Sequence, residues 1–360
     1  MPIRVTNTTR RSFVAVASLA LTGLAHAVEP TGRQKAKIKI GQIGVGHGHA
    51  NKLSVYRRSS DYEVVGVAEP DEELRKRAVA QPAFEDVPWM TQEQLLNVEG
   101  LQAVLVETRV RDLLPTAEAC VAAGKHVHLD KPAGESLAHY RRILRAAAER
   151  GLLVQMGYMY RYNPAFVLLR DLLARGWLGE PFEVAAVMSK VVSPADRQRF
   201  AAYRGGMMFE LGCHIIDLVV GLLGKPQRVV PFARHVADID DSLVDNMLAV
   251  LEHPKATATV RSTALEVEGF ARRHLTVCGT EGTFHIQPLD DPAAHVAFAS
   301  PRGEYLAGYQ EIRFAKFERY VADAAEMAAI LRGEKESQFT SEHDLAVQET
   351  VLRASGLPVE

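Results

Sequence analysis

Lys131, Glu210 and His214 are the side chains whose types and spacing best suit acid–base chemistry. Glu210 and His214 are four residues apart, so on a helix they share one face and can converge on one substrate. A neutral imidazole can remove a hydroxyl proton, and a carboxylate can orient the ring and stabilise the imidazolium. The same pair could instead form a surface ion pair or a contact with the helix dipole.

Lys131 stands directly before Pro132, after a short strand predicted to begin at His126. Parallel sheets bind ligands at the carboxyl ends of their strands, so this position points to a cleft. An ammonium group there can stabilise an alkoxide or relay a proton, and partial burial would lower its pKa. An exposed loop lysine is the alternative. We predict that Lys131, Glu210 and His214 are the catalytic residues.

A glycine-rich turn follows the first predicted strand, which covers residues 38–43. Gly44 and Gly46 match the first two positions of the G-x-G-x-x-G/A pattern, and His49 stands at the third. Glycines at the first two positions permit a tight turn and a close approach of the backbone to a pyrophosphate at a helix N-terminus. The residues predicted to bind a dinucleotide here are Gly44, Gly46, His47, Gly48 and His49.

Glu69 ends the second predicted strand, 23 residues after Gly46. A carboxylate at this place can accept hydrogen bonds from the adenosine ribose hydroxyls, and it would repel a 2′-phosphate. The sequence therefore favours NAD over NADP, although Arg75 or Lys76 could still bind a phosphate. The alternative is a flavodoxin-like fold that holds no dinucleotide.

No metal site is predicted. His47 and His49 are two residues apart on a turn, with no acidic residue near them in the sequence. The three cysteines, Cys120, Cys213 and Cys278, are far apart and lack the spacing of zinc ligands or of a disulfide framework.

Length and composition indicate a folded protein of two domains. The chain has 360 residues, and 47% of them are hydrophobic. A chain of this length usually forms more than one hydrophobic core. Lys and Arg number 42 against 44 Asp and Glu, giving a net charge of −2. This balance argues against a nucleic-acid-binding protein, which would carry an excess of basic residues.

The order of predicted elements gives the fold class. Strands and helices alternate from residue 37 to 157, which is typical of a Rossmann-type, doubly wound parallel sheet. From residue 158 to 355 several long strands with short turns predict an α/β domain with an open, largely antiparallel sheet. A helix over residues 207–223 would carry Glu210 and His214, and terminal helices are predicted over 310–332 and 342–354.

The first 27 residues have the form of an export signal. Arg10 and Arg11 precede a short apolar run that ends at residue 24, and residues 25–27 read Ala-His-Ala, a small-x-small cleavage pattern. The segment resembles a twin-arginine signal, which predicts a periplasmic or secreted protein with no stable membrane anchor. A retained membrane anchor is the alternative.

Three longer segments resemble the Gfo/Idh/MocA oxidoreductases. They are AGKHVHLDKP at 123–132, GYMYRYNP at 157–164 and GGMMFELGCHIID at 205–217. The resemblance implies an NAD-binding Rossmann domain, a second domain whose sheet often forms an oligomer interface, and hence a homodimer or homotetramer. It also implies that Lys131 contacts the reacting hydroxyl.

The resemblance extends to further binding residues, with departures. Thr108 and Asp130, together with Lys131, match cofactor-binding positions, although Asp130 replaces the usual Glu. Tyr160 and Arg161 match positions that border nicotinamide and substrate, or they pack the domain junction. Asp217 would bind a substrate hydroxyl or orient His214, or else serve as a cap or salt-bridge partner. Glu210 replaces the usual Asp, Arg109 the usual Pro and Leu113 the usual His.

The resemblance predicts an NAD(P)-dependent oxidoreductase that acts on a CH–OH group of a sugar or cyclitol. Because free nicotinamide cofactor is scarce outside the cytoplasm, an exported enzyme is expected to keep its NAD bound. One alternative is a redox-neutral glycosidase that works by transient oxidation and elimination. An alternative of another class is a non-catalytic, NAD(H)-bound sugar sensor.

Overall fold

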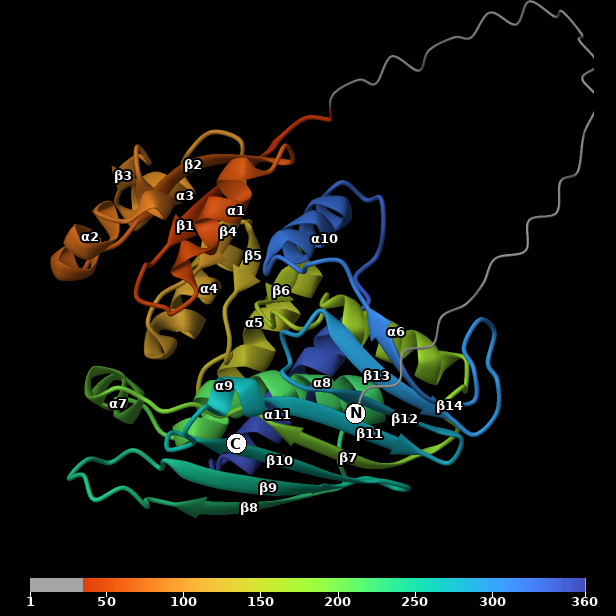
Figure 1. Ribbon diagram of the computed structural model, residues 1–360. Helices are drawn as coiled ribbons and strands as arrows, with labels where there is room; N and C mark the ends of the chain where they lie inside the picture. Colours follow the sequence, from red (N-terminus) through yellow and green to blue (C-terminus); the bar gives the residue numbers. More distant parts are fainter. Residues whose placement is uncertain (1–34, 360) are drawn as a thin grey trace, which may run out of the picture. The chain divides into compact units, whose positions relative to one another are not determined.

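The computed structural model describes residues 35–359. The predicted export signal at residues 1–27 lies outside these residues. Residues 36–359 form one compact unit that contains two β-sheets (Figure 1).

The first sheet is parallel throughout and has the strand order β3-β2-β1-β4-β5-β6. Its strands are β1 (Ile38–Ile43), β2 (Tyr62–Ala68), β3 (Trp89–Met90), β4 (Leu101–Val106), β5 (His126–Leu129) and β6 (Val154–Met156). The helices between them are α1 (Leu53–Arg58), α2 (Glu72–Val79), α3 (Gln92–Leu96), α4 (Leu113–Ala122) and α5 (Leu137–Glu149). The central strands β1 and β4 are buried on both faces, as parallel strands covered by helices are.

Side-chain caps fix where several of these helices begin. The Asp71 carboxylate accepts hydrogen bonds from the backbone N–H groups of Glu73 and Leu74 at the start of α2. Thr91 and Gln94 form a reciprocal capping box at the start of α3. Such caps satisfy N–H groups that have no partner within the helix.

The second sheet has eight strands in the order β14-β13-β12-β11-β7-β10-β9-β8. They are β7 (Pro181–Val187), β8 (Arg228–Arg234), β9 (Asn246–Glu252), β10 (Thr257–Thr263), β11 (His274–Gly279), β12 (Gly282–Ile286), β13 (Ala293–Phe298) and β14 (Gly308–Arg313). Only the β7–β10 pair is parallel. The predicted fold class, a Rossmann domain followed by an α/β domain with a largely antiparallel sheet, is confirmed.

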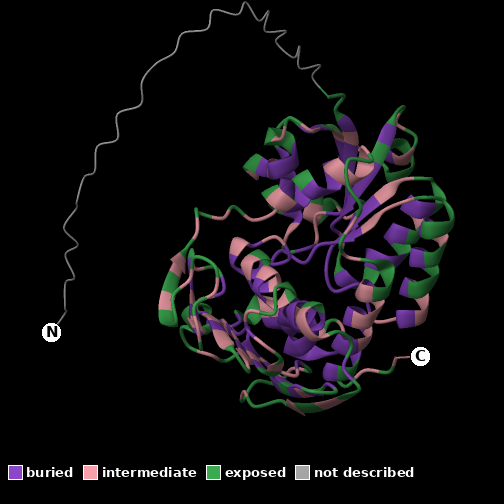
Figure 2. Cartoon of the chain, turned by 90° about the vertical axis from the view of Figure 1, so that its right-hand side faces the viewer, coloured by how far each residue is buried: buried purple, intermediate pink, exposed green. Residues whose placement is uncertain are grey.

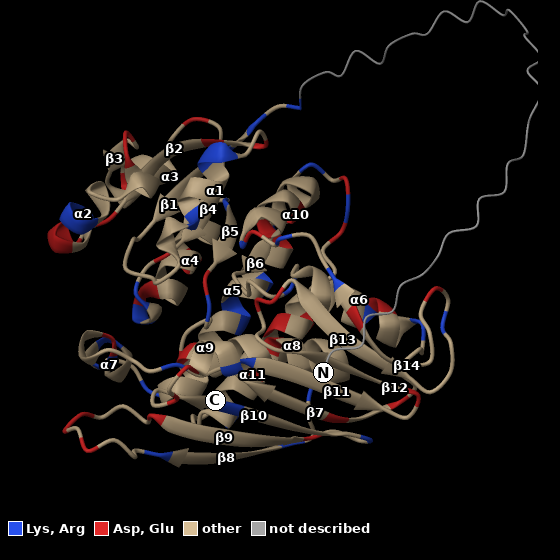
Figure 3. Cartoon of the chain, in the orientation of Figure 1, with Lys and Arg blue, Asp and Glu red and all other residues tan. Residues whose placement is uncertain are grey.

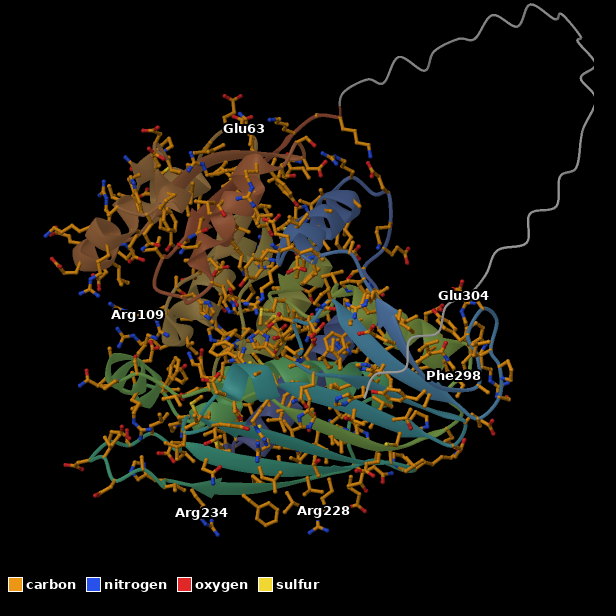
Figure 4. The ribbon with its side chains drawn as sticks, viewed as in Figure 1. Glu63, Arg109, Arg228, Arg234, Phe298 and Glu304 are labelled. Atoms are coloured by element: carbon orange, nitrogen blue, oxygen red, sulfur yellow. The ribbon has the colours of Figure 1, made fainter. Side chains whose placement is uncertain are left out.

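The helices in this part of the chain are α6 (Pro164–Ala174), α7 (Pro194–Ala201), α8 (Cys213–Leu223), α9 (Gly269–Arg272), α10 (Val321–Leu331) and α11 (Ser341–Ala354). Of these, α8 and α11 pack against strands of the second sheet. Figure 1 shows α8 and α11 between the second sheet and the first domain, and Figure 2 shows that buried residues are concentrated there. Arg228 and Arg234 of the edge strand β8 project away from the molecule (Figure 4).

Two predictions about the C-terminal part need correction. The helix predicted over 310–332 is interrupted, because residues 308–313 pair as strand β14 with β13. The remaining helix, α10, was assigned to the second domain but packs against the first. Ala324, Met327 and Ala328 share a hydrophobic cluster with Ile38 of β1, and the Tyr62 hydroxyl donates to the Ala324 carbonyl oxygen at 2.7 Å.

Across residues 35–359, none of the helices has the length and apolar character that crossing a bilayer requires.

Asp323, near the start of α10, carries a buried carboxyl group that lacks a hydrogen-bond partner at one oxygen, Oδ1. Burial raises the pKa of this group to about 7. A raised carboxyl pKa means that the folded state disfavours the charged form. Stability is therefore lost as the pH rises from the ordinary value of 3.8 to about 7.

We expect Asp323→Asn to stabilise the protein at pH 8 by about 1–3 kcal/mol and to have little effect near pH 4. The difference in Tm between variant and wild type should grow between these pH values and level off above pH 7. Thermal melts across this range measure it, with the exposed Asp240→Asn as control. A difference that does not change with pH would contradict the assignment.

Candidate active site

The glycine turn after β1 lies against the turn after β4. Gly44 has a φ of +90°, and a Cβ atom added there would lie 2.5 Å from the Thr108 backbone nitrogen. Only glycine permits both this backbone conformation and this close approach. At Gly48, by contrast, an added Cβ would meet nothing within 4 Å.

Glu69 fastens the glycine turn to the end of β2. Its Oε2 accepts a hydrogen bond from the Val45 N–H at 2.8 Å, and its Oε1 accepts one from the Asp71 N–H at 2.9 Å. Each carboxylate oxygen keeps a free lone pair for a ribose hydroxyl. The glycine cradle, Glu69 and the following turn of helix thus fit a dinucleotide of the kind that the sequence predicts.

A buried cluster of four charged or polar side chains, the Lys52 cluster, lies behind this turn. The Lys52 ammonium donates hydrogen bonds to Asp130 Oδ2 at 2.7 Å and to His128 Nε2 at 2.9 Å. Glu107 Oε1 lies 2.9 Å from Lys52 Nζ, outside hydrogen-bonding geometry. The ring of Tyr320, which precedes α10, lies 5.1 Å from the same nitrogen. Figure 3 shows acidic and basic segments between the two sheets, where most residues are uncharged.

The two carboxyl groups of this cluster differ in protonation. Burial, together with the nearby Asp130 carboxylate, raises the pKa of Glu107 well above its usual range. Burial also opposes ionisation of Asp130, but His47, Lys52 and His49 outweigh it and hold its pKa well below the usual range. These opposite directions favour one charged pair, Lys52 with Asp130, and a protonated Glu107.

Asp130 links the cluster to the glycine turn and to Lys131. Its Oδ1 accepts hydrogen bonds from the Lys131 N–H at 2.6 Å and from His49 Nδ1 at 3.1 Å. His47 Nε2 donates to the Lys131 carbonyl oxygen at 2.9 Å. Burial lowers the pKa of His49 to about 4, so its ring is neutral. The predicted cofactor residues His47, His49 and Asp130 are thus in direct contact.

The argument against a metal ion needs correction, because the fold supplies the acidic residue that the sequence did not show. His47, His49 and Asp130 offer three ligand atoms within 4.8 Å of one another. The Lys52 ammonium, 2.7 Å from Asp130 Oδ2, already provides a positive charge at this place. The absence of a metal stays a prediction.

Lys131 and Glu210 come together across the two domains. Lys131 Nζ donates to the Glu210 carbonyl oxygen at 2.9 Å and to its Oε1 at 3.3 Å, and the Tyr203 hydroxyl donates to Glu210 Oε2. Burial opposes the charged form of Lys131, but Glu210 outweighs it, so the pKa of Lys131 is raised. The predicted lowering of this pKa is wrong: Lys131 is an ammonium donor.

His214 is neutral and makes no side-chain hydrogen bond to any of residues 35–359. Its side chain is buried, and Nδ1 has no partner. Burial, with Lys131 as the next contribution, lowers its pKa well below 6.5. The rings of Tyr158, Tyr160 and His49 surround it, with centroids 6.1, 5.9 and 5.8 Å from its own.

Glu210 and His214 do not form the pair that their spacing predicts. Residues 208–212 form a π-helical turn, and the regular helix α8 begins only at Cys213. Such wider turns often occur at functional sites. Glu210 is directed to Lys131 and Tyr203, and the described contacts of His214 are with aromatic rings and with the field of Lys131.

Of the predicted substrate-binding residues, Tyr160 lies at the site and the other two pair with each other. The Tyr160 hydroxyl donates to Asp290 Oδ2 at 3.3 Å. Arg161 points the other way and forms buried hydrogen bonds with Asp217 at 2.6 Å and with Asp344 at 2.6 Å. This geometry gives Arg161 and Asp217 a structural role, and their contact with substrate stays a prediction.

Three residues of the site were missed by sequence reasoning: Lys52, Glu107 and Tyr203. Glu107 had a usable signal, because it follows the apolar strand β4 directly, as Glu69 follows β2. The other two lie in no motif and reach the site only through the fold.

The Lys52 cluster makes a prediction about stability. We expect Glu107→Gln to cost less than about 1 kcal/mol, because a protonated Glu and a Gln are both neutral and similar in shape. Asp130→Asn should cost about 3–5 kcal/mol, because it leaves the buried Lys52 without its charged partner.

Urea unfolding at pH 7 measures both values. The exposed Lys76→Met serves as a control, since Lys76 forms only a surface pair with Glu73. Equal losses for the two cluster variants would contradict the assigned protonation states.

Family models match both halves of the chain. Residues 38–158 match an oxidoreductase family with an NAD-binding Rossmann fold, and residues 166–285 match the GFO/IDH/MocA C-terminal domain. Together the two matches cover more than half of the sequence.

Curated relatives are oxidoreductases of cyclic alcohols and of sugars. The chain is 29% identical over 200 residues to trans-1,2-dihydrobenzene-1,2-diol dehydrogenase of Macaca fuscata fuscata, covering 54% of this chain and 58% of the relative. It is 31% identical over 138 residues to dTDP-3,4-didehydro-2,6-dideoxy-α-D-glucose 3-reductase of Streptomyces violaceoruber. This match covers 38% of this chain and 40% of the relative. The chain thus spans less than two thirds of either relative.

A solved structure with the same fold is an oxidoreductase from Agrobacterium radiobacter in complex with NAD+, L-tartaric acid and magnesium. The TM-score is 0.76 at 17% identity, and the match covers 89% of this chain and 97% of the other. At this identity the match establishes the fold alone.

Proposed function

Because the chain belongs to the GFO/IDH/MocA family of NAD(P)-dependent oxidoreductases, we propose that it interconverts a secondary alcohol and a ketone on a sugar or cyclitol, with NAD as cofactor. The observation that carries the proposal is that His214, a buried imidazole with an unpaired ring nitrogen, lies close enough to the Lys131 ammonium for this charge to lower its pKa. The first can accept a proton, and the second can stabilise negative charge on oxygen.

NAD, held by the glycine turn and Glu69, would supply the hydride acceptor for the substrate carbon. The Lys131 ammonium, held by Glu210, donates a hydrogen bond to the substrate oxygen and stabilises the charge that develops there. His214 takes the hydroxyl proton on a ring nitrogen, and in the direction of reduction it returns that proton. Glu210 and Tyr203 orient Lys131.

A polyhydroxylated ring suits the polar groups around His214. Lys131, Glu210 and Tyr160 provide hydrogen-bond donors and acceptors, while the aromatic rings at His214 supply apolar contact. The relatives named above act, by their names, on a cyclic diol and on a sugar. Both facts support a cyclic polyol substrate.

We further propose that NAD stays bound between catalytic cycles. The support is the twin-arginine pattern of Arg10 and Arg11, which predicts export to a compartment where free cofactor is scarce. The buried contacts of the glycine turn with Glu69 and the Lys52 cluster would preorganise the site for tight binding.

We expect Lys131→Met to reduce turnover by about 100-fold or more, because Lys131 acts on the substrate oxygen. NAD should stay bound to this variant. Cofactor is released by denaturing exhaustively dialysed protein and is quantified by mass spectrometry. Turnover is followed at 340 nm with a panel of sugars and inositols. The exposed Lys76→Met is the matched control.

Two results would contradict the proposal. Full activity of Lys131→Met would remove Lys131 from the mechanism. A wild-type protein that carries NAD but converts no sugar or cyclitol of the panel would favour the non-catalytic sensor.

Glu69 provides the test of cofactor choice. We expect Glu69→Ala to weaken NAD binding by about 10-fold, through loss of the ribose contact, and to raise the NADP-to-NAD affinity ratio. Calorimetric titration measures both ligands. Glu69→Gln, which keeps one acceptor oxygen for the turn, separates the loss of charge from the loss of the backbone contacts. The exposed Glu72→Ala is the control, and an unchanged ratio would argue against the ribose contact.

A further inference from the structure

Arg273 is a buried arginine between α9 and β11. Only 4% of its surface is exposed, its Nε donates to the Ser189 carbonyl oxygen at 3.2 Å, and its guanidinium lies 3.9 Å from the ring centre of Phe270. A Cβ added at Gly269 would lie 2.8 Å from the Ser189 carbonyl oxygen, so α9 is packed tightly on this segment. The position of Arg273 is therefore fixed on two sides.

The guanidinium of Arg273 has no carboxylate within ion-pair distance anywhere in residues 35–359. Arg161, which is equally buried, has two such partners, Asp217 and Asp344. A buried charge without a partner is costly, so proteins rarely keep one that serves no function. Arg273 thus differs from the structural arginines of this protein.

The nearest acidic group is already engaged by other partners. Asp290 interacts with Arg273 through space, but its oxygens accept hydrogen bonds from Arg319 at 2.6 and 3.2 Å and from the Tyr160 hydroxyl at 3.3 Å. Arg319 therefore balances the charge of Asp290, and the charge of Arg273 is left over.

Arg273 lies on the substrate side of the site. Its guanidinium is in contact with the Tyr160 hydroxyl, and the ring centre of Tyr160 lies 5.9 Å from that of His214. Lys190 is half-buried, and its Nζ lies 5.4 Å from the ring centre of Phe200. In this region Arg273 and Lys190 are two cations that no carboxylate pairs within the described part of the chain.

We propose that Arg273, assisted by Lys190, binds a carboxylate of the substrate, so that the substrate is a sugar acid such as a uronate or an aldonate. The planar fork of a guanidinium matches the two oxygens of a carboxylate, and the partly apolar surroundings strengthen the interaction. The inference rests on the proposed function, since it names the class of polyol that the site takes.

The test compares a sugar acid with its uncharged amide, which keeps the ring hydroxyl groups. D-glucuronate and D-galacturonate, their amides, and D-glucose 6-phosphate are titrated calorimetrically into NADH-loaded protein, on which an alcohol cannot react. At least one uronate should bind about 10-fold or more tightly than its amide. Arg273→Met should reduce this ratio to near one and leave the affinity of the amide within about twofold.

Two further variants separate recognition from folding. Arg272→Met is the matched control, because Arg272 is exposed and pairs with Glu266. It should keep the wild-type preference. Arg273→Lys keeps the positive charge but loses the planar guanidinium, so it should keep part of the preference for the uronate over its amide. Because Arg273→Met also removes the hydrogen bond to Ser189 and the contact with Phe270, thermal melts verify that both variants are folded before their binding is compared.

The outcomes distinguish this inference from the proposed function. Equal binding of uronates and amides to the wild type, a preference for the phosphate ester, or a preference that survives Arg273→Met would overturn the carboxylate site alone. If the wild type binds no NADH, or if it binds none of the compounds in the series, the proposed function is overturned as well.

Discussion

The hydrogen bond between the Lys52 ammonium and the Asp130 carboxylate is the interaction on which the rest of the site depends. A lysine buried at the carboxyl ends of β4 and β5 is tolerable only because Asp130 stays ionised beside it. The same carboxylate then holds the Lys131 backbone and the His49 ring. This ion pair thus fixes both the glycine turn and the backbone of Lys131.

A second ion pair joins the two domains at the reacting centre. Lys131 follows the parallel sheet, Glu210 lies in the π-helical turn before α8, and Tyr203 completes the set. The Glu210 carboxylate contacts both Lys131 and Tyr203. His214 is left with a free nitrogen, which is the property that a proton acceptor needs.

The arginines of the second domain show how burial separates structural from functional charge. Arg161 is enclosed by Asp217 and Asp344, and this network joins the domain-crossing segment to α8 and α11. Arg273 is also buried but has no carboxylate within ion-pair distance among the described residues, and it contacts the Tyr160 hydroxyl. The same side chain stabilises the fold in one place and leaves a charge available to a ligand in the other.

The sequence alone determined the two-domain α/β architecture, the glycine turn and the region of the site, because strand–helix alternation and short motifs are local patterns. It did not show that residues 308–313 pair as an edge strand or that α10 returns to the first domain, since both depend on partners distant in the chain. It also misjudged the pKa of Lys131. Protonation is decided by burial and by charges such as Glu210, 79 residues away, which only the tertiary structure brings within 3.3 Å.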